Sequence, residues 1–315
     1  MSKYKQLLAT TQDTTSNYVG EVAAGYYSAA LLSSDTIRNG AISVMPNIKY
    51  KENLPRLELS GLIKDRTCDF DDTGVITYTE TVITPEEFSV NLEICKQPYR
   101  STWMAEQMGF SANDNLAPDF ARYLLSLVLA NVASENETII WSGVTGTAGQ
   151  YNGFETLFTN QPAQPAAQEI AGTTLSAANI IAQIALMVAQ IPNTVYGKQD
   201  LNLLLPTSAV KFYITAMATL GYLDKFHVGQ TELNYEGINI IHCPGMSDNT
   251  MFAVRQSNFF FGTGILADME SSIRLIDRSV TEGDDNVRVV MNYTAAVQVK
   301  LPEEVVTYGI TNAGN

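Results

Sequence analysis

The feature that most constrains the fold is an unbroken helical pattern that follows Pro118. Proline suits a first helical turn, because the N–H groups there have no intrahelical partner. Apolar residues then recur at helical spacing, namely Leu124, Val128, Val132 and Ile139. Nothing breaks the pattern before Gly143, which predicts one helix over about residues 116–142, roughly 40 Å long. Because this exceeds the usual globular helix, it either crosses a whole domain or forms the spine of an elongated subunit.

Strand patterns precede this helix. The run from Val75 to Ile83 is rich in β-branched residues, and apolar and polar residues alternate from Phe88 to Ile94. Asp72, Thr73 and Gly74 supply turn residues, and the segment 57–62 can pair with one of the runs. We therefore expect a long two-stranded excursion over residues 58–95. A lone hairpin is marginal in water, so it must rest on another surface.

The first 57 residues are punctuated by turn-forming residues, which predicts an extended arm with little core of its own. Tyr18 to Leu32 could form a short helix and Ala41 to Val44 a strand. Such an arm lies either on a neighbouring subunit or on its own domain, and the sequence leaves both open.

Helices and strands alternate after the long helix. A helix carrying Ile181, Ile184, Val188 and Ile191 ends at Pro192, and Leu201–Leu205 is typical of a buried strand. A further helix begins after Pro206. Strands are predicted at 238–241, 251–255, 272–277 and 287–299, and the apolar stripe of the long helix should face the last of them. Of the phenylalanines at 259–261, at least one should lie in the core, because neighbours on a strand point to opposite faces.

This order of elements, with the GVTGTAG turn and Gly153-Phe154 after the long helix, resembles the tailed-phage major capsid proteins with the Hong Kong ninety-seven fold. The resemblance covers roughly residues 55–305 and implies an α+β fold. It implies an N-terminal arm (1–57), an extended β-hairpin loop (58–95), a peripheral domain with the spine helix (96–165 and 266–315) and an α/β axial domain (166–265).

The same resemblance implies a coat protein that self-assembles through pentamers and hexamers into an icosahedral shell enclosing phage double-stranded DNA. The expected location is the virion capsid, assembled in the host bacterial cytoplasm. Expected partners are the protein itself and a portal, scaffold or decoration protein. An encapsulin-like nanocompartment shell protein and a soluble hydrolase or binding domain with an unrecognised site are the alternatives.

Charge and hydropathy exclude several other classes. The net charge of −14, with no run of Lys or Arg, argues against a protein that reads nucleic-acid sequence. No stretch is long and apolar enough for a transmembrane helix, and the N-terminus lacks the apolar core of a secretory signal. Cys68, Cys95 and Cys243 have no paired spacing, which favours a reducing compartment during synthesis.

One segment has the spacing of a calcium-binding loop. In Asp69 to Glu80, residues Asp69, Asp71, Thr73, Gly74, Ile76 and Glu80 occupy positions 1, 3, 5, 6, 8 and 12 of that motif. The flanks, however, are typical of strands rather than helices. The favoured interpretation is a solvated acidic hairpin turn.

Residues for catalysis do not converge in the sequence. The two histidines, His227 and His242, lie in separate segments, and His242 and Cys243 should point to opposite faces of a strand. Lys51 and Lys64, the candidates for the isopeptide cross-link that some members of this capsid family form, do not lie at the inferred loop tip. We therefore expect no enzyme activity, no cofactor, and no catalytic, cofactor-binding or metal-binding residues.

Overall fold

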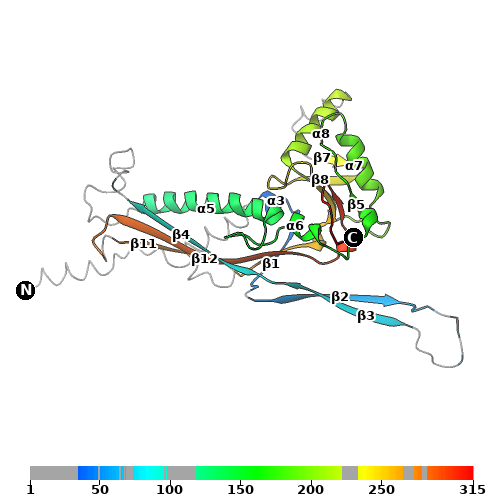
Figure 1. Ribbon diagram of the computed structural model, residues 1–315, viewed down its shortest axis with the longest axis horizontal. Helices are drawn as coiled ribbons and strands as arrows, with labels where there is room; N and C mark the ends of the chain where they lie inside the picture. Colours follow the sequence, from blue (N-terminus) through cyan, green and yellow to red (C-terminus); the bar gives the residue numbers. More distant parts are fainter. Residues whose placement is uncertain are drawn as a thin grey trace, which may run out of the picture.

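The computed structural model describes residues 35–48, 50–63, 65–66, 68, 74–95, 97, 118–221, 233–264, 273–278 and 282–314. Figure 1 shows a long helix lying along one sheet, a second sheet with two helices, and a two-stranded ribbon that projects away from both. The predicted α+β class is confirmed. No helix in the described part of the chain is long and apolar enough to cross a membrane.

The long helix α5 runs from Pro118 to Ser142, within two residues of the predicted start and at the predicted end. It lies along a five-stranded sheet formed by β1 (Ser43–Pro46), β4 (Glu86–Cys95), β10 (Phe259–Thr263), β11 (Ile273–Asp277) and β12 (Asn286–Val299). The central strand is β12, whose 14 residues pair with β4 on one side and with β10 and β11 on the other.

The contact between helix and sheet is apolar. Alternate residues of β12 face α5, and the packed residues form one buried cluster. Its members include Leu125, Val128 and Val132 of the helix and Val287, Val289 and Met291 of the strand. The prediction that the apolar stripe of this helix faces the last long strand is confirmed.

The second sheet has six strands in the order β5 (Glu169–Ile170), β13 (Val306–Tyr308), β9 (Met251–Arg255), β6 (Leu201–Leu205), β8 (Ile238–His242) and β7 (Leu233–Tyr235). Helices α7 (Ile180–Ala189) and α8 (Thr207–Thr219) pack on it through a second buried cluster. All five residues of β6 are buried, as its apolar sequence predicts.

Aromatic residues join the two sheets. Trp141, at the end of α5, lies 5.5 Å from Phe154 and 5.6 Å from Phe252, measured between ring centroids. Phe154 begins the short helix α6 (Phe154–Thr159) and stacks on Phe259 at 4.1 Å. Phe259 and Phe261 are fully buried whereas Phe260 is not, which confirms the alternation expected along this strand.

The described part of the arm, residues 35–48, packs on its own chain. Thr36, in the short helix α3 (Asp35–Arg38), donates its backbone N–H to Oε2 of the buried Glu137 at 3.2 Å, and its hydroxyl to Oε1. The N–H of Gly245 also donates to Oε1 at 3.4 Å. Glu137 therefore joins the arm, the long helix and the turn after β8. Tyr18 to Leu32 lie outside the described residues.

The projecting ribbon consists of β2 (Glu52–Ser60) and β3 (Val75–Ile83), paired along their full length. The pairing of Leu57 and its neighbours with a downstream run is confirmed. The expected excursion over 58–95 differs in one respect, because β4 pairs with β12 in the sheet under α5 and is not part of the ribbon. The alternating sequence of β4 predicted a strand but contained no information about its partner.

The strand pairings also bear on the proposed domain division, which stays a prediction. β10, within the predicted axial segment 166–265, pairs with β12. β13, within the predicted peripheral segment 266–315, pairs with β9 and β5 of the other sheet. The remaining short elements are η2 (Ala166–Gln168), η3 (Gln256–Asn258) and η4 (Pro302–Glu304).

Candidate functional site

The ribbon of β2 and β3 is the surface that stands out from the rest of the described chain. Because side chains alternate along a strand, the cross-strand register assigns each residue to one of two faces. Leu57 lies opposite Tyr78, and Leu59 opposite Ile76, on the same face. All four side chains are more than half exposed. The outer part of this face is therefore apolar, and no described residue covers it, whereas Asn53 and Glu80 make the same face polar nearer the root.

The opposite face of the ribbon is mostly polar, although it includes the exposed Val75 opposite Ser60. Glu58 lies opposite Thr77, and Arg56 opposite Thr79. The contrast with the apolar face means that the two sides prefer different surroundings: the threonine-rich side suits water, whereas the leucine-rich side gains free energy by leaving water. Soluble proteins rarely leave a contiguous apolar patch open unless another molecule covers it. The ribbon is thus a candidate interaction surface.

The ribbon is firmly attached at its root. Leu54 and Ile83 are buried, and Ile83 packs with Ile48 and Ala296 in a small cluster beside β12. A Cβ at Gly262 would lie 2.8 Å from Ile83 and 2.9 Å from Ile48, so the absence of a side chain there makes room for both. Gln298 of β12 also donates its side-chain N–H to the carbonyl of Val82 at 2.9 Å.

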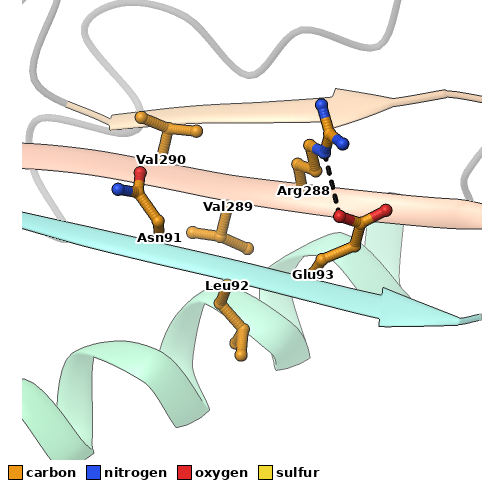
Figure 2. Close-up of a pocket in the computed structure, with 6 residues that line it drawn as sticks. All are labelled: Asn91, Leu92, Glu93, Arg288, Val289 and Val290. Carbon is orange, nitrogen blue, oxygen red and sulfur yellow. Dashed lines mark hydrogen bonds and ion pairs between the residues drawn. The ribbon is translucent and has the colours of Figure 1, made fainter.

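A shallow pocket of about 350 Å³ lies on the sheet between β4 and β12. Figure 2 shows Glu93 and Arg288 paired at its rim, with Leu92 pointing the other way, toward α5. Hydrogen bonds from Arg278 and Arg288 lower the pKa of the Glu93 carboxyl below its ordinary range. The carboxylate is therefore ionised and its charge is balanced by arginines of its own chain, which leaves it little capacity to bind a ligand.

The described part of the predicted calcium loop is not followed by a helix. Asp69, Asp71 and Thr73 lie outside the described residues, and the segment after Gly74 is strand β3. Glu80, the expected last ligand, accepts a hydrogen bond from the side-chain amide of Asn53 at 2.7 Å. Among the described residues, no three His, Cys, Asp or Glu side chains gather where they could hold a metal ion. Calcium binding by the whole segment stays untested.

His242 and Cys243 do not form a nucleophile and base. The Nε2 atom of His242 hydrogen-bonds to the Thr207 hydroxyl at 2.8 Å, whereas Cys243 is fully buried. Burial raises the pKa of the Cys243 thiol far above its ordinary value, so the reactive thiolate does not form. His227 lies outside the described residues. Of the two lysines considered for a cross-link, Lys51 is exposed just before β2 and Lys64 is not described.

No family model matches this sequence, and no curated protein sequence matches it. Solved structures do. The chain is similar to one titled as the capsid of a native GTA particle computed with C5 symmetry, with a TM-score of 0.61 and 10% identity, over 90% of this chain and 91% of that one.

Two further structures give comparable agreement. One comes from the satellite phage P4 procapsid including its size determination protein, with a TM-score of 0.54 and 12% identity over 90% of this chain and 98% of that one. The other comes from Mycobacterium phage Che8, with a TM-score of 0.53 and 11% identity over 89% of both chains. At these identities the likeness concerns the fold. The chain therefore has the tailed-phage major capsid fold, the Hong Kong ninety-seven fold.

Proposed function

We propose that this chain is a phage coat protein whose copies associate into a closed shell around double-stranded DNA. The single observation that carries the proposal is the projecting ribbon of a capsid-type fold, with one face of Leu57, Leu59, Ile76 and Tyr78 exposed to solvent. In this proposal a second copy covers that face. The role is structural, and no catalytic step is required.

The size of the apolar face makes this association favourable. Full burial of a leucine or isoleucine side chain stabilises by about 1.5–3 kcal/mol. Since these four residues are already partly covered, each contributes on the order of 1 kcal/mol when a neighbour covers it. One ribbon contact is then weak by itself, because association costs several kcal/mol in lost freedom of motion. In a closed shell every copy both gives and receives such a contact. The free energies of many contacts therefore add up.

The geometry of the contact follows from the shape of the subunit. A ribbon that projects from one copy onto a different surface of the next makes a head-to-tail interface, and such interfaces produce rings when the rotation closes. We propose that these rings are pentamers and hexamers, and that ribbons also join one ring to the next. Stability should then depend on the total area buried rather than on single ion pairs at the rim.

The negative net charge of the chain suits a shell protein better than a sequence-specific DNA-binding protein. At −14 the subunit repels phosphate, so it can enclose a genome without sequence-specific binding. In this proposal a portal, a scaffold and decoration proteins complete the particle, which assembles in the host bacterial cytoplasm and becomes the virion capsid.

The test compares two ribbon variants by sedimentation velocity. Leu59→Asp with Ile76→Asp places two charges on the apolar face, and Ser60→Asp with Thr77→Asp places the same charges on the polar face. We expect the wild type and the polar-face variant to form particles of many copies, and the apolar-face variant to sediment as the single subunit. Equal assembly of both variants would show that the apolar face is not the contact. The ratio of absorbance at 260 and 280 nm in particles from infected or expressing cells reports whether nucleic acid is enclosed.

A further inference from the structure

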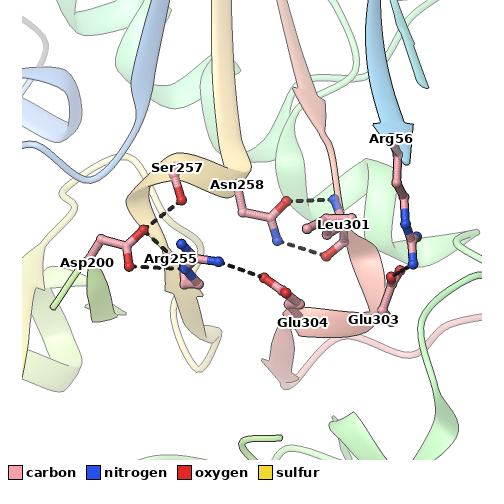
Figure 3. A network of polar contacts seen from close by, with 8 residues as sticks. All are labelled: Arg56, Asp200, Arg255, Ser257, Asn258, Leu301, Glu303 and Glu304. Carbon is pink, nitrogen blue, oxygen red and sulfur yellow. Dashed lines mark hydrogen bonds and ion pairs between the residues drawn. The ribbon is translucent and has the colours of Figure 1, made fainter. Parts of the chain in front are cut away.

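Among the residues that the structure describes, Arg56 links the ribbon to the body beyond the buried root. Arg56 extends from the polar face of β2 and forms an ion pair with Glu303 of η4, as Figure 3 shows. It also pairs with Glu58 on its own strand. From Leu57 outward, every described residue of β2 and every residue of β3 up to Glu80 is exposed. Arg56 is therefore placed where the ribbon leaves the body.

Its partner is held rigidly. The carbonyl of Glu303 accepts a hydrogen bond from the Gln168 side chain at 2.7 Å. Just before η4, the backbone N–H of Leu301 donates to the side-chain oxygen of Asn258 at 2.6 Å, and the Asn258 amide donates back to the Leu301 carbonyl at 2.8 Å. Glu303 therefore stands on a segment fixed from two sides.

The next residue ties η4 to the six-stranded sheet. Glu304 accepts from Nη1 of Arg255 at 3.4 Å. The Nε–H of the same arginine donates to both carboxylate oxygens of Asp200, at 3.0 and 3.1 Å. Asp200 also accepts a hydrogen bond from the Ser257 hydroxyl at 2.6 Å. A continuous set of charged contacts thus runs from the second sheet through η4 to the ribbon (Figure 3).

We propose that the Arg56–Glu303 ion pair is a positioning contact that fixes the angle at which the ribbon leaves the body and, with it, the angle between neighbouring copies in a shell. The second half of this statement rests on the proposed function. A two-stranded ribbon anchored only at its root, by Leu54, Ile83 and the Gln298–Val82 hydrogen bond, can swing about that root, because no third described strand supports it. The ion pair supplies a second fixed point.

The outer end of β2 lies far enough from Arg56 that a small change of angle displaces it appreciably. A strand rises about 3.3 Å per residue, so Ser60 lies about 13 Å beyond Arg56. A swing of about 10° moves that end by about 2 Å, enough to misplace the apolar face on a neighbour. An ion pair of partly exposed side chains contributes little to folding stability, which separates a positioning role from a stabilising one.

The test measures ribbon orientation in the unassembled protein. Spin labels on Thr77→Cys and Ser134→Cys, in a background carrying Cys68→Ser and Cys95→Ser, report the ribbon-to-helix distance by double electron–electron resonance. Without further substitutions, we expect a single narrow distribution of the distance between the two labels. For Arg56→Glu, we expect a distribution that is at least twice as broad or that has a different mean distance. Arg56→Glu combined with Glu303→Arg should restore the narrow distribution. Arg38→Ala, which breaks an exposed pair with Asp35 on α3, is the matched control and should change nothing.

Two results would overturn the positioning role: an unchanged distribution in Arg56→Glu, or no recovery in the charge-swapped variant. The consequence for assembly is read separately, as the spread of particle diameters by electron microscopy. We expect Arg56→Glu to widen that spread and the swap to narrow it again, and an unchanged spread would overturn the link to shell geometry. If the unaltered protein forms no particles, the proposed function fails, while the distance measurement still decides the positioning role.

Discussion

Removal of the Glu137 carboxylate is the most informative single perturbation of the folded subunit. Glu137 is 7% exposed and accepts hydrogen bonds from the N–H and hydroxyl of Thr36 and the N–H of Gly245. The chain approaches so closely here that a Cβ at Gly245 would lie 2.1 Å from the Glu137 carbonyl oxygen, so no larger residue can take its place. In Glu137→Ala, the buried N–H of Thr36 and the partly buried N–H of Gly245 lose their acceptor.

The expected cost follows from these contacts. A buried donor left without an acceptor costs about 1–3 kcal/mol, whereas the Thr36 hydroxyl can rotate to another partner. The Thr36 N–H therefore accounts for most of the loss and the partly buried Gly245 N–H for a smaller part. After subtraction of the desolvation cost that the carboxylate no longer imposes, the loss is about 2 kcal/mol. For a chain of this size that corresponds to a fall in melting temperature of about 3 °C.

Urea unfolding of the unassembled protein, followed by tryptophan fluorescence, measures this loss. Trp141 is a suitable reporter because its indole N–H donates to the Thr36 hydroxyl at 3.0 Å. Glu135→Ala is the control, since Glu135 is the same residue type two positions earlier on the helix but is exposed. It should change the unfolding free energy by less than about 0.5 kcal/mol. Equal losses of unfolding free energy in Glu137→Ala and Glu135→Ala would show that the buried carboxylate does not stabilise this site.

Three further predictions concern the core, pH and thiol reactivity. Val128→Asp should prevent folding, because it buries an unpaired charge against β12, whereas Leu127→Asp on the exposed side of α5 should give soluble, folded protein by circular dichroism. The folded-state pKa of Glu93 is lowered, mainly by hydrogen bonds from Arg278 and Arg288, so its stabilisation is present above the ordinary value of 4.5 and is lost as the pH falls below it. Glu93→Gln should therefore lose less stability than the wild type when unfolding midpoints at pH 6 and below 4.5 are compared, and an identical pH dependence would contradict this. A thiol reagent should label Cys68 and Cys95 in the native protein and Cys243 only after denaturation, and native labelling of Cys243 would show that its site is open.

The long helix and most strands could be predicted because each depends on a local pattern. The spacing of Val128 and Val132 determines a helix face, and four of the five residues of Leu201–Leu205 are leucines because both faces of β6 are covered. The packing of α5 on β12 also followed, since both stripes need an apolar partner.

Strand partners could not be predicted in the same way. β4 alternates as clearly as β3 does, yet it pairs with β12, about 200 residues later in the chain. Three-residue β13 has too little sequence to carry a pattern, and it is a strand because β9 and β5 lie on either side of it. Such pairings depend on the folded arrangement of distant segments, which local periodicity does not encode.

The burial of Glu137 follows from its position on the helix rather than from the composition of its segment. The run Glu135–Thr138 has the composition of a solvated polar segment, yet the structure buries Asn136 and Glu137 and exposes their neighbours. Both buried residues lie one helical turn after Val132 and Ala133, on the apolar face. Helical phase therefore indicated burial where composition indicated exposure. The partner, Thr36, could not have been identified from the sequence.

Electron cryo-microscopy of the purified protein at high concentration tests the proposed coat function most directly. We expect closed shells in which the face formed by Leu57, Leu59, Ile76 and Tyr78 of each ribbon is buried on a neighbouring copy. Single subunits that never associate, or shells in which this face remains exposed to solvent, would contradict it.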